Sequence, residues 1–379
     1  MKLTISRNEL NDAVQQVSKA VSARTTIPIL SGIKIDAHAQ GITLTASDTD
    51  ISIQSFIPLE TADKVISTIH RAGSVVLPAK FFVEIIRKLP HEEVNIEVGD
   101  RFQTLIQSGA IDIQLMGMDP EEFPVLPVLE EERVFSIPGD ILRTMIRQTV
   151  FSVTTSESTP ILTGVLWSLA EGVLKFVATD RYRLATCKVN AGVDPGLHFS
   201  NVVISGKTLN ELSKIIPDHN VLVDIVVADS QVLFKVGNVL FFTRMLDGTF
   251  PDTTKIIPNQ FKTELFLNTK ALSEAIDRAY LLSREEKTNI VRLSTTEDGS
   301  VEISSSSSEL GRVQEMLTVE KLDGEPIRIA FNSKYMLDVL KVVDSENLFI
   351  GFNGPMSPII FKPEHDNSLH LILPYRTTN

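Results

Sequence analysis

Residues 3–17, LTISRNELNDAVQQV, join a short strand-like run to a helix-like pattern, and this combination decides the fold. Ser6 is a residue type that caps helix N-termini, and with Glu9 it predicts a capping box. After it, apolar residues recur at i, i+3, i+4 and i+7, namely Leu10, Ala13, Val14 and Val17. Such spacing is typical of a helix with one apolar face. The stretch therefore predicts a strand that runs directly into an amphipathic helix.

The same combination occurs six times along the chain. The residues that open the expected helices are Ser6, Pro78, Pro138, Ser205, Asn268 and Asn332, which are 60 to 72 residues apart. Serine, asparagine and proline suit a helix N-terminus, where backbone N–H groups lack partners. Repetition of this kind indicates a protein built from similar modules.

Between the expected helices, apolar and polar residues alternate, as in Val221, Val223, Ile225 and Val227. Period-two alternation predicts half-buried antiparallel strands. A longer repeat pairs the modules: PIL occurs at 28–30 and 160–162, Asp48 matches Asp180, and Phe-Pro occurs at 123–124 and 250–251. We therefore expect an α+β fold with three similar domains of two modules each, at residues 1–128, 129–256 and 257–379.

Length and composition fit this expectation. The chain has 379 residues, of which 43% are hydrophobic and 22% charged, and a single cysteine, Cys187. These values are typical of globular domains, and one cysteine excludes a disulfide framework. Because the apolar runs are short and MKLTISRNEL lacks a signal-peptide core, we expect neither a membrane-spanning nor a secreted protein, and predict a cytoplasmic one.

The charge is unevenly distributed. The whole chain carries −12, which argues against a nucleic-acid partner, yet the six expected helices (7–20, 79–89, 138–149, 205–216, 268–282 and 333–343) together carry +5. The cationic side chains crowd onto the faces opposite the apolar stripes. Two interpretations stay open: ordinary solvated helix faces, or a weakly basic surface for a polyanion.

Motifs of catalysis and metal binding are absent from the sequence. It contains no phosphate-binding glycine motif, no Gly-x-Ser-x-Gly and no His-x-x-x-His. We interpret His365 and His370, around Asp366, as part of a solvated turn rather than a metal site. The sequence therefore predicts no catalytic residue, no metal and no cofactor, and favours a binding role.

Several motifs resemble those of one family, the DNA polymerase III beta subunit of bacteria. They are PILSG at 28–32, PILTG at 160–164, Ala178-Thr179-Asp180 with Arg183-Leu184-Ala185, Leu246-Asp247-Gly248 with Phe250-Pro251-Asp252, Tyr335-x-Leu337-Asp338, and Leu373-Pro374-Tyr375-Arg376. The resemblance extends over the whole chain. It implies a sliding clamp, in which two chains join head to tail into a ring around duplex DNA.

In such a ring the helices would line the hole and contact DNA phosphates without reading sequence. The cationic residues expected there are Arg24, Lys80, Arg87, Lys88, Arg143, Arg147, Lys207, Lys214, Lys334 and Lys341. Ring closure would pair an edge strand of the first domain, through Ile113 and Leu115, with the third domain around Leu281 and Leu282. Such pairing would satisfy otherwise free strand edges.

The resemblance also implies a peptide-binding groove between the second and third domains. There the polymerase catalytic subunit, the clamp loader and other proteins would dock short motifs. Its residues would be Leu162, Thr179, Arg181, Tyr182, Arg183, Leu184, Pro251, Ile256, Met356, Pro358, Leu371, Leu373, Pro374, Tyr375 and Arg376. An apolar slot with arginines at its rim suits a peptide with leucine or phenylalanine anchors. This chain departs from common relatives at Arg181-Tyr182, where they often have Gly-His, and at Tyr375.

Two hypotheses follow. The first is a non-catalytic clamp that forms a homodimer, encircles DNA and tethers the replicative polymerase. The second is a repeat-built enzyme with a site at a domain joint, whose carboxylates would be Asp48 and Asp180. Because these two aspartates occupy equivalent repeat positions, they would lie in separate domains, which counts against paired acid–base chemistry.

Overall fold

The computed structural model describes residues 1–22, 25–126, 129, 133–285, 288–364 and 367–376. These residues form two compact units, one made of Met1–Asp140 with Glu211–Met245 and the other of Ile141–Asn210 with Leu246–Asn379. We call them unit 1 and unit 2. In the described ranges no helix has both the length and the apolar character that a membrane crossing needs.

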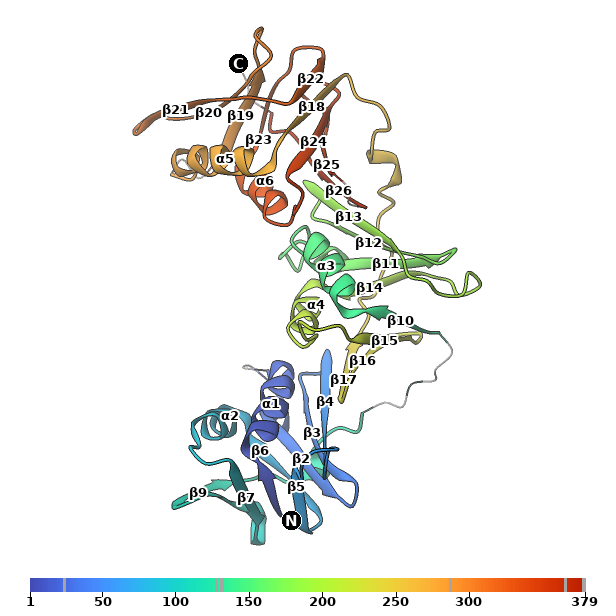
Figure 1. Ribbon diagram of the computed structural model, residues 1–379, viewed down its shortest axis with the longest axis vertical. Coiled ribbons are helices and arrows are strands. Elements are labelled where there is room, and N and C mark those ends of the chain that lie inside the picture. Colours follow the sequence, from blue (N-terminus) through green and yellow to red (C-terminus); the bar gives the residue numbers. More distant parts are fainter. Residues whose placement is uncertain (23–24, 127–128, 130–132, 286–287, 365–366, 377–379) are drawn as a thin grey trace. The chain divides into compact units, whose positions relative to one another are not determined.

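Unit 1 contains two antiparallel sheets (Figure 1). The five-stranded sheet has the order β5-β1-β7-β8-β9, with β5 (Ser67–Arg71), β1 (Lys2–Ser6), β7 (Glu93–Val98), β8 (Gln103–Ser108) and β9 (Ile111–Met116). The eight-stranded sheet has the order β10-β15-β16-β17-β4-β3-β2-β6, with β10 (Val134–Pro138), β15 (Leu222–Val227), β16 (Gln231–Val236), β17 (Val239–Arg244), β4 (Ile51–Pro58), β3 (Gly41–Ser47), β2 (Gly32–His38) and β6 (Gly73–Pro78).

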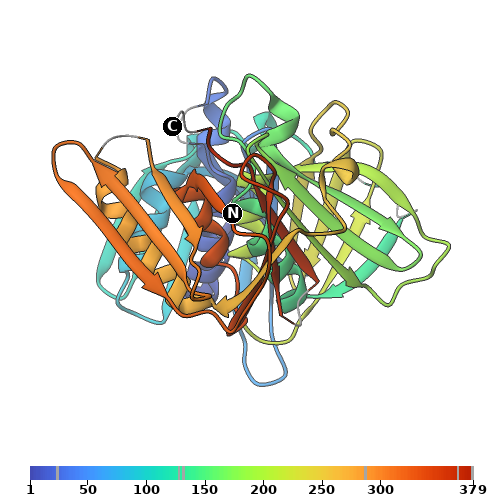
Figure 2. The same ribbon diagram turned by 90° about the horizontal axis from the view of Figure 1, so that it is seen from above.

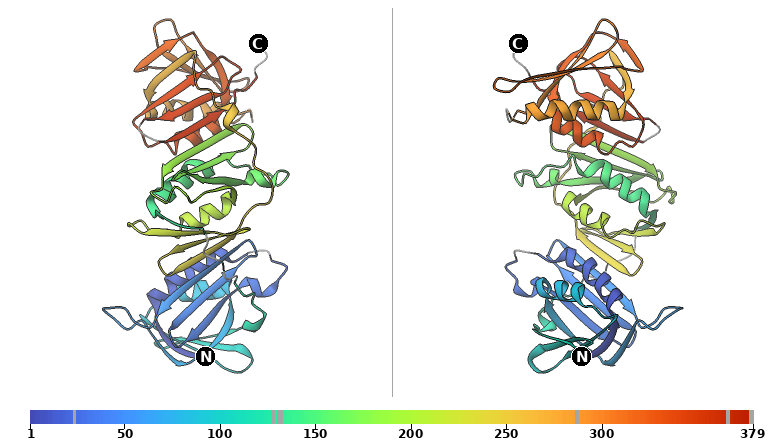
Figure 3. Two further views of the ribbon diagram at one scale, coloured as in Figure 1. Left: turned by 90° about the vertical axis from the view of Figure 1, so that its right-hand side faces the viewer. Right: turned by 60° about the vertical axis from the view of Figure 1, so that its left-hand side comes forward.

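Two helices of unit 1, α1 (Arg7–Val17) and α2 (Ala79–Lys88), lie side by side against these strands (Figure 3). Their apolar stripes are buried: Leu10, Ala13, Val14 and Val17 on α1, and Phe82 and Ile86 on α2. The opposite faces remain polar. Burial of one stripe against a sheet accounts for most of the stability of such short helices.

Unit 2 contains a nine-stranded and a four-stranded antiparallel sheet. The first has the order β14-β11-β12-β13-β26-β25-β24-β18-β22, with β14 (Phe199–Ser205), β11 (Gly164–Ala170), β12 (Val173–Thr179), β13 (Arg183–Asn190), β26 (Ser368–Ile372), β25 (Ile359–Pro363), β24 (Asn347–Phe352), β18 (Thr263–Asn268) and β22 (Lys321–Gly324). The second has the order β21-β20-β19-β23, with β21 (Gly311–Leu317), β20 (Val301–Ser307), β19 (Ile290–Thr295) and β23 (Arg328–Asn332).

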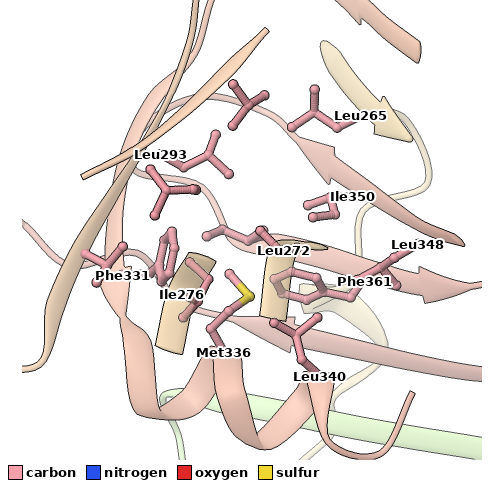
Figure 4. Close-up of a cluster of buried hydrophobic side chains, with 14 of the residues drawn as sticks. Leu265, Leu272, Ile276, Leu293, Phe331, Met336, Leu340, Leu348, Ile350 and Phe361 are labelled. Carbon is pink, nitrogen blue, oxygen red and sulfur yellow. The ribbon is translucent and has the colours of Figure 1, made fainter. Parts of the chain in front are cut away.

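The helices α5 (Thr269–Ser283) and α6 (Ser333–Leu340) of unit 2 pack on each other, and α5 also packs on β19, β20 and β21 (Figure 2). Between helices and strands lies an extensive apolar core. Side chains such as Leu272, Ile276, Met336, Phe331 and Phe361 converge there and are almost completely buried (Figure 4). Close packing of this kind fixes the position of α5 and α6 on one face of the sheets.

Two further helices, α3 (Gly139–Val150) and α4 (Gly206–Ser213), contribute residues to both units. In the described residues each of the six helices directly follows a strand: β1, β6, β10, β14, β18 and β23 precede α1 to α6. The α+β class and the sixfold strand-to-helix repeat expected from the sequence are therefore confirmed.

One local prediction is wrong. The Ser6 side chain makes no capping hydrogen bond, and Glu9 instead forms an ion pair with Lys64 at 3.0 Å, so no capping box forms. The two asparagines do cap their helices: the Asn268 side chain accepts from the Ala271 N–H, and the Asn332 side chain from the Lys334 N–H, both at 3.0 Å.

Candidate functional site

The predicted groove residues all belong to unit 2, where strands β13, β26 and β25 lie side by side (Figure 1). Leu184 is paired with Leu371, and Leu371 with Ile360. Because side chains alternate along a strand, these three residues share one face of the sheet. The neighbouring Ile372 and Phe361 belong to the helix-packed core instead. The groove therefore lies on the face of the sheet opposite α5 and α6.

The buried residues of the predicted groove belong to one apolar cluster. It contains Leu162, Val177, Leu184, Val203, Phe250, Ile360 and Leu371, all nearly buried. Three of these, Leu162, Leu184 and Leu371, are among the residues predicted for the groove. Val177, Val203, Phe250 and Ile360 pack with them but were not predicted; the repeated Phe-Pro pair and strand alternation were signals for Phe250 and Ile360.

Several apolar side chains of the predicted groove are unusually exposed. They are Tyr182, Ile256, Met356, Leu373 and Tyr375, with exposed fractions between 40% and 61%. They come from four chain segments: a turn, a short 3-10 helix at Thr254–Ile256, the loop before β25, and the tail after β26, which provides two of them. Exposed large apolar side chains around an apolar floor indicate a binding surface.

The turn between β12 and β13 is held by hydrogen bonds from its own side chains. The Thr179 hydroxyl donates to the Arg183 carbonyl at 2.7 Å and accepts from the Arg181 N–H at 3.2 Å. The Asp180 carboxylate accepts from the N–H groups of Tyr182 and Arg183, each at 3.0 Å. Arg181 has φ of +78°, in the left-handed region that glycine adopts most easily. These bonds hold the backbone of the turn that carries the exposed Tyr182 side chain.

Arg183 lies differently from the expected rim position. Its guanidinium donates to Asp180 at 2.9 Å and to Asp338 of α6 at 2.6 Å, and its side chain is only 11% exposed. It also stacks over the rings of Phe151 and Tyr335, at 5.6 and 4.5 Å from their centres. The guanidinium therefore faces the helices and ties β13 to α6, which leaves Arg181 and Arg376 as the exposed arginines of the predicted groove.

The Tyr335 hydroxyl is affected by the same surroundings. Burial, and secondarily the negative charge of Asp180, raise the pKa of Tyr335 above its usual value. The phenol therefore stays neutral at physiological pH. Its ring provides a stable aromatic surface for the Arg183 cation.

The tail after β26 is anchored to its neighbours. The Leu373 N–H donates to the Tyr182 carbonyl at 2.8 Å, and the Tyr375 N–H donates to the Ala330 carbonyl at 2.7 Å. The first bond continues the β13–β26 pairing beyond the last strand residue. Leu373 and Tyr375 are thus held in place although their side chains are exposed.

The cationic residues predicted to contact DNA lie on or just after the helices, apart from Arg24, which lies outside the described residues. On α2, Arg87 and Lys88 share Glu84, at 2.6 and 3.5 Å, whereas the ammonium of Lys80 lies 5.8 Å from the centre of the Phe81 ring. Exposed pairs like these stabilise the fold little and leave the cations able to contact an anion.

The remaining cations differ in their partners. Arg147 pairs with Asp344, which lowers the pKa of that carboxyl, and Lys214 pairs with Glu211 at 2.7 Å. No acidic side chain of the described residues lies within ion-pair distance of Lys207, Lys334 or Lys341, and all three are exposed. Arg143 is half-buried on α3.

Each of the four sheets ends in strands that are paired on one side only among the described residues, and two of these strands adjoin the residues predicted for ring closure. β9 in unit 1 is paired only with β8, and β21 in unit 2 only with β20, apart from an isolated bridge at Met118 next to β9. Ile113 and Leu115 lie half-buried on one face of β9, while Leu281 on α5 is 51% exposed and Leu282 is half-buried. A bidentate ion pair between Arg278 and Glu315 ties α5 to β21, lowers the pKa of the Glu315 carboxyl and raises that of Arg278.

The residues considered for catalysis have structural roles. Asp48 and Asp180 each accept two backbone N–H groups of their own turns. His370 is fully buried in β26, so its predicted place in a solvated turn is wrong, while His365 and Asp366 lie outside the described residues. Within the described ranges, no three His, Cys, Asp or Glu side chains are arranged to hold a metal ion.

Comparison with known proteins identifies the family. The DNA polymerase III beta subunit models match three consecutive segments, the N-terminal domain at residues 1–127, the central domain at 136–252 and the C-terminal domain at 254–376. The chain is 51% identical over 379 residues to the beta sliding clamp of Halalkalibacterium halodurans and 50% identical over 378 residues to that of Bacillus subtilis, with 100% of both chains covered in each case.

Solved structures agree. The DNA polymerase sliding clamp from Bacillus subtilis matches with a TM-score of 0.97 at 50% identity, over 100% of both chains. The DNA polymerase III beta chain from Streptococcus pneumoniae matches with a TM-score of 0.95 at 34% identity, over 99% of this chain and 100% of that one. The chain therefore belongs to the DNA polymerase III beta subunit family, the sliding clamps.

Proposed function

We propose that two copies of this chain close head to tail into a ring around duplex DNA, and that the ring tethers the replicative polymerase as a processivity factor. The proposal is supported by the placement of the predicted junction residues beside two unpaired sheet edges: Ile113 lies on β9 of unit 1, and Leu281 lies on α5, which the Arg278–Glu315 pair ties to β21 of unit 2. An unpaired strand edge can form hydrogen bonds with a further strand. In a head-to-tail ring of two chains, β9 of each chain would meet β21 of the other, so that both edges of each chain would be paired.

Leu281 and Leu282 would cover the apolar side of this junction, where they would meet Ile113 and Leu115 of the other chain. The variant Leu281→Asp with Leu282→Ala should be monomeric in analytical ultracentrifugation. As a matched control, Leu222→Asp changes an equally exposed leucine on β15 and should stay dimeric. A dimer that persists in the double variant would refute this junction.

The proposed DNA contacts are electrostatic and dispersed. Lys207, Lys334 and Lys341, which are exposed and have no acidic partner among the described residues, support this view. Diffuse contacts with phosphates hold a ring near DNA without fixing it to one sequence. After enzymatic loading, the protein should remain on circular DNA and slide off linearised DNA. Equal retention on both would contradict encirclement.

We further propose that the groove of unit 2 binds short peptide motifs of the polymerase catalytic subunit, the clamp loader and other replication and repair proteins. Its apolar floor and its exposed rim of Tyr182, Leu373 and Tyr375 support this role. Deletion of residues 373–379 should abolish calorimetric binding of polymerase-derived peptides while the dimer survives. Deletion of 377–379 alone is the control and should leave binding unchanged.

The protein itself is proposed to have no catalytic activity, because the carboxylates considered for it hold turns instead. We propose three domains at residues 1–128, 129–256 and 257–379, and a cytoplasmic location, where bacterial DNA is replicated. The alternative of a repeat-built enzyme would require a catalytic group at a joint. Polymerase stimulation by an Asp48→Asn, Asp180→Asn variant that still folds would argue against that alternative.

A further inference from the structure

Unit 1 contains a cavity of about 210 Å³ at the point where β4 and β17 meet. Its walls include Asp50, Ser52, Gln231, Phe242 and Arg244, with Leu126 from the segment after the first domain's sheet. Its surroundings repeat those of the groove in unit 2.

The strands around the two sites correspond closely. β2, β3 and β4 begin 132 residues before β11, β12 and β13, and all three have the same lengths as their counterparts. β4 pairs with β17 in the same way that β13 pairs with β26. The internal repeat of the sequence has therefore built the same strand arrangement twice.

The turns that enter β4 and β13 also match in their hydrogen bonds. Asp48 Oδ1 accepts hydrogen bonds from the N–H groups of Asp50 and Ile51, at 3.1 and 2.9 Å. Asp180 Oδ1 accepts from the equivalent N–H groups of Tyr182 and Arg183, each at 3.0 Å. The residue after each aspartate has a left-handed backbone, with φ of +81° at Thr49 and +78° at Arg181. Two sites that share such an uncommon conformation have the same backbone shape.

The bond that anchors the tail of the groove has its counterpart too. The Arg244 N–H donates to the Asp50 carbonyl at 3.0 Å, as the Leu373 N–H donates to the Tyr182 carbonyl at 2.8 Å. Arg244 therefore stands where the groove has an exposed leucine, and Asp50 where it has an exposed tyrosine. The two apolar rim residues of the groove are replaced by two charged ones.

The floor differs as well. In the strand register, the pair Ser52–Phe242 corresponds to Leu184–Leu371. The Ser52 hydroxyl lies 2.8 Å from that of Ser47 and forms a hydrogen bond with it. A serine at this position interrupts the apolar floor, which contracts to Phe242 and its neighbours, with Leu126 packed partly over them.

The charged rim is available to a ligand. The side chains of Asp50, Gln231 and Arg244 form no hydrogen bond or ion pair with other described residues, and Asp50 and Arg244 are exposed. The guanidinium of Arg244 can bind a carboxylate through two parallel hydrogen bonds. The carboxylate of Asp50 can accept hydrogen bonds from an ammonium or another N–H donor. A free amide suits an extended peptide backbone.

We propose that this cavity is a second docking site on each chain, which takes a short peptide with a small apolar residue between an acidic and a basic residue. The acidic side chain would pair with Arg244, the basic one with Asp50, and the apolar one would contact Phe242. Ser52 and Arg244 would reject the leucine and phenylalanine anchors that the groove accepts. The proposal rests on the proposed role of the groove, because it takes the groove as its template.

The first experiment replaces two cavity residues by the leucines that occupy the equivalent positions of the groove. In the variant Ser52→Leu with Arg244→Leu, the number of polymerase-derived peptides bound per chain should rise from one to two in calorimetry. An unchanged dimer and melting temperature would show that this variant folds. If a folded variant still binds one peptide per chain, the equivalence is refuted. If the unchanged protein binds none, the proposed function of the groove has failed instead.

The second experiment uses two blocked tripeptides, acetyl-Asp-Val-Lys-amide and acetyl-Lys-Val-Asp-amide, on the full-length dimer. One of them should shift the methyl NMR signals of Val125 and Leu126 at millimolar concentration. Arg244→Ala should weaken this binding about tenfold or more, as expected for the loss of a charge-assisted hydrogen bond. Leu373→Asp, which changes an exposed side chain at the predicted groove, should leave it unchanged. Absence of shifts with both tripeptides, or their loss in a Leu373→Asp variant with an unchanged melting temperature, would overturn a separate second site.

Discussion

His370 makes the stability of unit 2 sensitive to acid. Its ring is fully buried in β26, neither ring nitrogen has a hydrogen-bond partner among the described residues, and the centre of the Phe151 ring lies 5.6 Å away. Burial lowers the pKa of His370 from 6.5 to about 3. The histidine is therefore neutral in the folded protein.

The direction of the pH effect follows from this lowered pKa. Below pH 6.5 the unfolded chain takes up a proton at His370 that the folded chain cannot bind. Stability is consequently complete above pH 6.5 and is lost progressively as the pH falls towards 3. With one pKa unit equivalent to about 1.4 kcal/mol, the loss at pH 5 amounts to about 2 kcal/mol.

The variant His370→Phe should remove this loss. Phe241 of β17 pairs with β4 in unit 1 at the position where His370 of β26 pairs with β13 in unit 2. A phenylalanine is therefore compatible with this strand pairing. Urea unfolding at pH 7 and pH 5, at one protein concentration, measures the free energy of unfolding of both proteins. Between these pH values the variant should lose about 2 kcal/mol less than the unchanged protein.

An exposed histidine provides the control. His219→Gln should lose as much stability between pH 7 and pH 5 as the unchanged protein does, because it changes an exposed side chain and leaves the buried ring of His370 in place. If His370→Phe and the unchanged protein lost the same stability over this range, the reasoning about the buried, unpaired ring would be refuted.

Three other variants test separate features. Arg181→Gly should raise the free energy of unfolding by about 0.5–1 kcal/mol, since it relieves a left-handed backbone, and a decrease in urea unfolding would contradict this. Arg183→Met should lower the free energy of unfolding by about 3 kcal/mol or more, because Asp338 loses its cation. Adding Asp338→Asn should restore part of this loss in urea unfolding, and no restoration would argue against the ion pair. Lys207→Ala should weaken DNA binding modestly and reduce its salt slope by about 1, whereas complete loss of binding would indicate a specific contact.

The sequence alone determined the modules. Helices α1 to α6 and their preceding strands follow from local patterns, because apolar periodicity decides which face of an element is buried regardless of its distant partners. The 132-residue repeat likewise predicted that the turns at Asp48 and Asp180 are equivalent, and their hydrogen bonds agree. The predicted groove residues were taken from the motifs of the family resemblance. Those motifs give positions in the sequence and say nothing about which side chains touch.

Only the tertiary structure decided which neighbours those residues have. Arg183 was expected at the rim, but its partner Asp338 is 155 residues away and draws the guanidinium to the helix side. His370 was expected in a solvated turn, but pairing with β13 and β25 buries it. The polar cavity beside Ser52 depends on a register between strands almost 190 residues apart. Local patterns carry no information about such pairings, since they are fixed by how the sheets close over long distances in the chain.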